Sequence, residues 1–371
     1  MTSIAVNKNI IAIARHLHID CYDYSNHKII DVESQDANDS ISDIVIASNC
    51  EYIAIITSTS KQLIIYNWPT VTTKRKYVLP RSASKIRFSP QNDHIFVADK
   101  TGDVLKYDIS KESDGIKLLG HLSLLLNVLQ TSDSKFIISS DRDEKIRVSC
   151  YPNTYNIHTY CLGHTEFVNH LEFLPHDNKY LTSTSGDGTI RCWDYVTGKM
   201  HHSIDTFLDI NDETLKSDFA KVMIEEGIEV KSLPIVHYAI TKIDESCSIL
   251  AIAVYNFNKI LVYSLNSDNK SLKHRLLEKI DVEQLPSSLA LYGSSLFVYF
   301  DVRGIVLIYT IKYENTNISL ELDKTVQMFV NDQSNGILNL ENKHPIKLLY
   351  KRKFDNVQEY QERKKQRLGK V

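Results

Sequence analysis

Paired cysteines and long apolar runs are absent from this sequence of 371 residues. The six cysteines lie far apart, and no two of them form a Cys-x-x-Cys pair, so we expect neither a disulfide framework nor a zinc site. No stretch approaches the roughly 20 consecutive apolar residues that a membrane-spanning helix needs. Near the N-terminus, Lys8 and Arg15 interrupt the apolar residues, which does not fit an export signal. These absences predict a soluble protein that is not secreted.

Recognisable catalytic motifs are absent as well. The sequence has no dinucleotide-binding glycine motif after a strand, no phosphate-binding loop, no His-Glu-x-x-His and no nucleophile elbow. Two close histidine pairs, His16 with His18 and His201 with His202, have no carboxylate or thiol at ligand spacing beside them. We therefore expect a binding protein with no catalytic residues, no cofactor and no metal ion of its own; an enzyme with a central pocket is the alternative.

The charge of the chain is distributed unevenly. The formal net charge is -3, but residues 343–371 contain ten Lys or Arg against three Asp or Glu, a net charge of +7. That leaves -10 on residues 1–342. An acidic body with a basic tail predicts different partners for the two parts.

One short pattern recurs along the chain: an apolar residue, two further strand residues, and then an aromatic residue. The last position of the pattern falls on Tyr22, Tyr66, Tyr107, Ser149, Trp193, Tyr263 and Tyr309. Five of the six intervals lie between 41 and 46 residues, close to the about 40–45 residues of a four-stranded propeller blade. The seven copies predict an all-β, seven-bladed β-propeller over residues 1–340, followed by a basic tail over 341–371.

The sixth interval is 70 residues long and contains an insertion, roughly residues 205–233. Within it, Leu215, Phe219 and Met223 recur at helical spacing, and Gly227 is a suitable stop. We expect a helix that covers the scaffold's own surface; a lid or partner-binding helix is the alternative.

Two copies also carry a Gly-His pair, Gly120-His121 and Gly163-His164, 43 residues apart. With the Trp-Asp ending of the fifth copy, this resembles the WD40 family, whose blades join a His, a strand Ser or Thr, a turn Asp and a Trp by hydrogen bonds. The matching residues are His164, Ser183 (or Ser185), Asp187 and Trp193. A hydrolase triad has the same residue types, but occurrence within one blade and partial repetition favour a buried structural network.

A more specific resemblance comes from Ser140-Asp-Arg-Asp-Glu-Lys-Ile-Arg-Val-Ser149, from Cys161-Leu-Gly-His-Thr-Glu-Phe-Val168, and from Leu349-Tyr-Lys351 in the tail. These segments are similar to the WD-repeat non-catalytic subunit of tRNA (guanine-N7)-methyltransferase. The resemblance implies a heterodimer in which a separate Rossmann-type subunit binds S-adenosylmethionine and methylates a guanine of the tRNA variable loop. The propeller would stabilise and position that subunit without catalysing methyl transfer itself.

The same resemblance implies that one hairpin supplies ion pairs to the catalytic subunit. The matching positions are Asp143, Glu144, Lys145 and Arg147. Alignment of the fourth and fifth copies puts Asp143 at the position of Asp187, so residues 141–145 are expected at an exposed tip, and a second reading gives Asp143 a role inside its own blade. Solvated loop charges are the alternative to partner binding. On the partner-binding interpretation, Arg147→Glu should separate the subunits and leave the propeller folded.

The tail allows three interpretations. Tyr350, Phe354 and Val357 have helical spacing, so a short amphipathic helix could dock on protein while basic residues meet tRNA phosphates. The same lysines and arginines also match a two-part nuclear localisation pattern, which is the second interpretation. In the third interpretation the tail has neither role. The basic residues concerned are Lys351, Arg352, Arg363, Lys364, Lys365 and Arg367. We expect a nuclear protein, with the cytoplasm as an additional location.

A general interaction scaffold, such as a substrate receptor of a ubiquitin ligase, is the alternative function. Tyr195 and Val196 follow Trp193-Asp194, and neither is the arginine that such adaptors usually show there.

Overall fold

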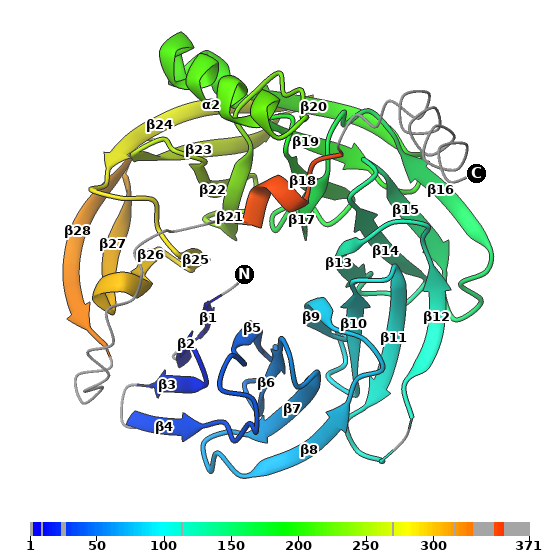
Figure 1. Cartoon of the computed structure of the whole chain (residues 1–371). Coiled ribbons are helices and arrows are strands. Elements are labelled where there is room, and N and C mark those ends of the chain that lie inside the picture. The colour runs from blue at the N-terminus through cyan, green and yellow to red at the C-terminus, as the bar shows by residue number, and fades with distance from the viewer. Residues whose placement is uncertain are drawn as a thin grey trace, which may run out of the picture.

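Seven four-stranded antiparallel sheets surround a central axis in the computed structural model (Figure 1). The structure describes residues 3–8, 10–23, 27–112, 114–268, 271–314, 317–328 and 345–351. Each sheet is built from four strands that follow one another in the chain, with the first strand of each blade nearest the axis. The predicted seven-bladed β-propeller is therefore confirmed.

Blades 1 to 4 contain, in chain order, β1 (Ile4–Asn7), β2 (Ile10–Arg15), β3 (His18–Tyr22), β4 (His27–Asp31), β5 (Ile41–Ile46), β6 (Tyr52–Thr57), β7 (Gln62–Asn67), β8 (Thr73–Val78), β9 (Ala83–Phe88), β10 (His94–Asp99), β11 (Asp103–Asp108), β12 (Ile116–Gly120), β13 (Leu125–Gln130), β14 (Phe136–Asp141), β15 (Ile146–Cys150) and β16 (Ile157–Cys161). Blades 5 to 7 contain β17 (Val168–Phe173), β18 (Tyr180–Ser185), β19 (Thr189–Asp194), β20 (Lys199–Asp205), β21 (Ile235–Lys242), β22 (Cys247–Val254), β23 (Lys259–Asp268), β24 (Ser271–Asp281), β25 (Ser288–Tyr292), β26 (Ser295–Phe300), β27 (Ile305–Glu314) and β28 (Asn317–Gln327). A short 3-10 helix, η1 (Asp301–Arg303), lies between β26 and β27.

The repeated aromatic position lies on the third strand of every blade. Trp193 and Tyr263 are fully buried there, within apolar clusters that the sheets form against one another. Ser149 takes this position in blade 4 and is buried as well, and its hydroxyl accepts a hydrogen bond from Arg147 Nε at 2.8 Å. The period of the sequence pattern therefore follows one structural position.

The ring closes by side-chain packing between the first and last blades. Ile4 and Ile13 of blade 1 share an apolar cluster with Tyr299 and Val306 of blade 7. Arg15 Nε also lies 3.5 Å from a carboxylate oxygen of Asp301. Among the strands the structure describes, the two blades close the ring without exchanging a strand.

Two helices form the insertion between β20 and β21, as predicted: α1 (Thr206–Ile210) and α2 (Glu213–Glu225). Asp212 caps α2 by accepting a hydrogen bond from the backbone N–H of Leu215, and Gly227 follows the helix at a φ of +73°. Phe219 and Met223 are buried against the propeller core, so α2 covers the scaffold's surface. No helix in the described part of the chain is long and apolar enough to cross a membrane.

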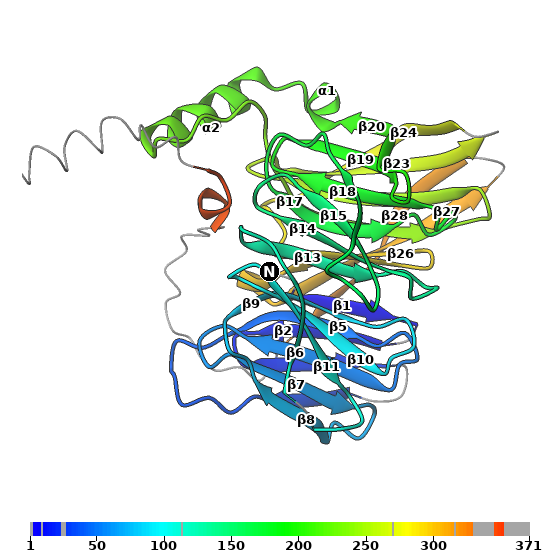
Figure 2. The same cartoon turned by 90° about the vertical axis from the view of Figure 1, so that its right-hand side faces the viewer.

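The C-terminal end of the described chain returns to the propeller. A 3-10 helix, η2 (Pro345–Leu348), lies on the same face of the ring as α2 (Figure 2). The predicted domain boundary near residue 340 lies outside the described residues and stays a prediction.

Candidate partner-docking site

A linear hydrogen-bonded chain crosses the interior of blade 5. Trp193 Nε1 donates to Ser183 Oγ at 2.8 Å, and that hydroxyl lies 2.8 Å from His164 Nε2. On the other side of the ring, His164 Nδ1 lies 2.9 Å from Asp187 Oδ2. A neutral imidazole with its proton on Nδ1 satisfies every member of this chain.

The protonation states of this network follow from its burial. Burial lowers the pKa of His164 despite its carboxylate partner, which keeps the ring neutral. For Asp187, burial opposes ionisation, but hydrogen bonds from His164, from Thr189 and from the Thr165 backbone outweigh it and hold the pKa well below its usual value. Ser183 is completely buried, so its hydroxyl is not accessible to a substrate as a nucleophile. The four residues therefore form a structural network.

Blade 4 contains a second network with a shifted aspartate. His121 lies 2.8 Å from both Asp141 Oδ2 and Ser139 Oγ. Asp143 does lie at the strand register of Asp187, but Asp141 occupies the register position that Ser185 has in blade 5, and the imidazole of His121 pairs with Asp141 instead. Asp143 is therefore not the partner of His121, but it does hold its own blade together, since its Oδ1 accepts a hydrogen bond from Ser123 Oγ in the loop before β13 at 2.8 Å.

The hairpin between β14 and β15 is held by the buried Asp141, which was expected at the exposed tip. Its Oδ1 accepts hydrogen bonds from the backbone N–H groups of Asp143 at 2.9 Å and Lys145 at 3.1 Å. Glu144 stands between them with a φ of +68°. Because a buried carboxylate fixes the turn, the exposed Lys145 is presented from a rigid tip.

Arg147 bonds to its own blade and to the last strand of blade 3. Its Nε donates to Ser149 Oγ, its Nη1 to the carbonyl of Gly120 at 3.1 Å and its Nη2 to that of Thr154 at 3.0 Å. Burial lowers the pKa of this guanidinium. Arg147→Glu would remove these three hydrogen bonds, so its effect on partner binding has to be measured beside its effect on folding, and the partner-binding role of Arg147 stays a prediction.

Two exposed leucines beside the hairpin escaped the sequence reasoning. Leu122 is fully exposed in the loop before β13. This loop is bonded to the hairpin, because the backbone N–H of Arg142 donates to the carbonyl of Leu124 at 2.9 Å. Leu162 is 63% exposed and follows Cys161, the register partner of Ile146. The available signal was an apolar residue next to each Gly-His pair.

The C-terminal segment reaches the same hairpin. Tyr350 is buried, donates its hydroxyl to the carbonyl of Gly186 at 3.0 Å and meets the ring of Phe167 edge-on at 5.0 Å. Lys351 Nζ then lies 2.6 Å from Glu144 Oε1 and 3.7 Å from Asp143 Oδ1.

The other predicted tail positions lie outside the described residues. They are Arg352, Phe354, Val357, Arg363, Lys364, Lys365 and Arg367.

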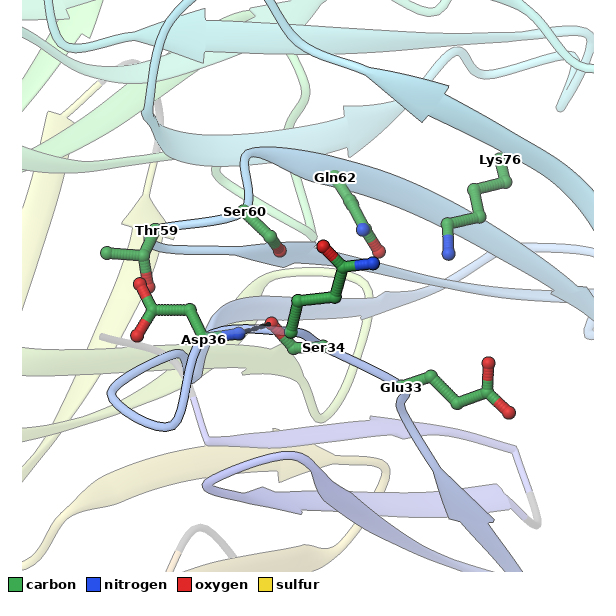
Figure 3. Close-up of a pocket in the computed structure, with 8 residues that line it drawn as sticks. Glu33, Ser34, Asp36, Thr59, Ser60, Gln62 and Lys76 are labelled. Atoms are coloured by element: carbon green, nitrogen blue, oxygen red, sulfur yellow. Dashed lines mark hydrogen bonds between the residues drawn. The ribbon is translucent and has the colours of Figure 1, made fainter.

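A polar hollow of about 700 Å³ lies elsewhere, over loops of blades 1 and 2 (Figure 3). Its lining consists of Glu33, Ser34, Gln35, Asp36, Thr59, Ser60, Gln62 and Lys76. None of these is a histidine or cysteine, and Ser60 already donates to the buried Asp39. The described residues contain no group of three potential metal ligands. The hollow therefore gives no support to an enzyme.

Comparison with known proteins agrees with the sequence resemblance. Residues 112–295 match the family model of the tRNA methyltransferase TRM82 WD40 domain. The non-catalytic subunit wuho of tRNA (guanine-N(7)-)-methyltransferase from Culex quinquefasciatus is 32% identical over 313 residues, 81% of this chain and 68% of that protein. Its counterpart wdr4 from Xenopus laevis is 39% identical over 50% of this chain and 48% of its own length.

A solved structure supports the fold alone. A chain of the Mitotic Checkpoint Complex crystal structure superposes with a TM-score of 0.64 at 12% identity, over 81% of this chain and 88% of that one. The length and identity of the match to the Culex protein, in agreement with the family-model match, establish that the chain belongs to the family of non-catalytic subunits of tRNA (guanine-N(7)-)-methyltransferase.

Proposed function

We propose that this chain binds the catalytic subunit of the methyltransferase through the hairpin between β14 and β15 and its two neighbouring loops. It thereby holds that subunit in position to form N7-methylguanosine in the tRNA variable loop. The observation that carries the proposal is the rigid hairpin tip: Asp141 fixes the turn from inside, while Lys145 is exposed. A pre-ordered contact loses little conformational entropy on binding.

The leucines supply the apolar part of this surface. Leu122 lies in a loop that bonds to the hairpin and Leu162 follows the register partner of Ile146, so we place both leucines in the surface that the partner covers when it pairs with Lys145. Apolar burial contributes about 25 cal/mol per Å², whereas an exposed ion pair contributes at most about 1 kcal/mol. Most of the binding energy at this tip should therefore come from the leucines, and Lys145 should govern the specificity.

The double variant Leu122→Asp with Leu162→Asp tests this surface. We expect the affinity for the purified catalytic subunit to fall by about 30- to 100-fold, because about 2–3 kcal/mol of apolar burial is replaced by desolvation of two carboxylates. Titration calorimetry measures the affinity. Val78→Asp, at an exposed apolar position in blade 2, is the matched control and should bind as the wild type does. Equal affinities for all three proteins would contradict the docking site.

The basic tail gives the second part of the proposal. Residues 343–371 carry a net charge of +7 next to an acidic body, which suits tRNA phosphates. Arg352 and the run from Arg363 to Lys365 also fit a two-part import signal, so we propose that the protein works in the nucleus. The tail's composition supports both roles.

A further inference from the structure

The two acidic residues of the hairpin tip already have a partner within the chain. Lys351 lies 207 residues after Glu144 in the sequence, yet its ammonium group contacts the carboxylates of both Glu144 and Asp143. No local sequence pattern requires this contact. Its cause must lie in whatever fixes Lys351 at that place.

An apolar anchor fixes it. Ile346 and Tyr350 are 2% and 3% exposed within the core cluster that also contains Phe219 and Met223 of α2. Lys347 adds an ion pair of 3.0 Å with Glu226 at the end of α2. Because the backbone on its N-terminal side is pinned, Lys351 loses less freedom in its ion pair than an ordinary surface lysine, and this makes the pair more favourable.

The contact changes the electrostatics of the tip. Asp143, Glu144 and the neighbouring Glu166 are carboxylates; Arg142 and Lys145 are the cations of the tip, and Lys231 acts on Glu166. Burial raises the pKa of Glu166 to about 7, and the charges of Glu144 and Asp187 add to this effect. Lys351 supplies the positive charge that contacts the carboxylates of Glu144 and Asp143 directly, and although partial burial opposes it, the hydrogen bond with Glu144 raises the pKa of Lys351.

We propose that residues 346–351 form a clip that neutralises the carboxylates of the docking hairpin, so that the hairpin offers the catalytic subunit Lys145 together with the two leucines. This surface fits a partner segment that carries acidic and apolar side chains. Without the clip, the tip would repel such a segment. The inference rests on the proposed docking function. The clip also holds Lys351, the last described residue of the basic tail, at the docking hairpin.

A charge exchange tests the clip. Lys351→Glu places a fourth carboxylate at the tip, and we expect the affinity for the catalytic subunit to fall about tenfold. The double variant Glu144→Lys with Lys351→Glu restores the ion pair with reversed polarity and should return the affinity to within about threefold of the wild type. Lys351→Met, which removes only the charge, should weaken binding in the same direction to a smaller extent. Lys135→Glu is the matched control, because it replaces the lysine of an exposed ion pair with Asp133 in the same blade. It should leave the affinity for the catalytic subunit unchanged.

The outcomes separate this inference from the docking proposal. If the wild type does not bind the catalytic subunit, the docking proposal fails. If the wild type binds, and both Lys351→Glu and Lys351→Met bind with the affinity of the wild type, the clip is contradicted and the docking proposal stands. If the double variant binds as poorly as Lys351→Glu, the clip is also contradicted, since Lys351 then contacts the partner directly. Thermal unfolding of each variant shows that the comparison is made between folded proteins.

Discussion

Trp193→Ala is expected to lower the free energy of unfolding by about 3–5 kcal/mol. The indole is completely buried in a cluster that joins blades 4 and 5 and includes Ile146 and Val148 of the docking strand β15. Alanine leaves a large cavity there and removes the indole N–H donor of Ser183. The effect therefore reaches the hairpin as well as blade 5.

Chemical denaturation measures this loss of unfolding free energy, and two further variants serve as comparisons. Trp193→Phe keeps most of the ring and removes the hydrogen bond, so it should lose less than alanine does, about 1–2 kcal/mol. Tyr155→Ala, at a residue that is 76% exposed, should stay within about 0.5 kcal/mol of the wild type. A loss below about 1 kcal/mol for Trp193→Ala would show that this network does not stabilise the propeller.

Removal of residues 352–371 is expected to abolish the salt-sensitive part of tRNA binding. This segment holds seven Lys or Arg against three acidic residues. About four phosphate contacts would make the affinity of the full chain fall roughly 100-fold between 50 and 200 mM salt. The truncated chain keeps the Tyr350 anchor and Lys351, so its fold and its affinity for the catalytic subunit should persist.

Fluorescence anisotropy with labelled tRNA at several salt concentrations tests the RNA contact, and imaging of tagged full and truncated chains tests nuclear import. The substitution of Arg363, Lys364 and Lys365 with alanine is the milder variant and should reduce both effects. Unchanged tRNA affinity after truncation would remove the RNA role of the tail. Unchanged nuclear accumulation would remove its role as a localisation signal.

The blade pattern was predictable because it repeats. The aromatic position always lies on the third strand, where burial on both sides favours a large side chain, so a period near 43 residues predicted the ring. The helical insertion was predictable for the same kind of reason, since Phe219 and Met223 lie one helical turn apart.

The docking site was predictable only in part. Blade 4 has Asp141 where blade 5 has Ser185, so His121 pairs with Asp141 and not with Asp143, and strand alignment alone does not show which carboxylate the imidazole meets. Charged residues in one hairpin also look alike in sequence, whereas Arg147 bonds inward and Lys145 is exposed. The contact of Lys351 with Glu144 depends on how the chain returns to blade 5, which no local pattern encodes.

The most direct test of the account is a tRNA guanine-N7 methylation assay with the purified catalytic subunit alone, with this chain alone, and with both together. We predict no methylation by this chain alone, and a rate with both that clearly exceeds the rate of the catalytic subunit alone, together with co-purification of the two. No increase in rate and no co-purification, or methylation by this chain alone, would contradict the account.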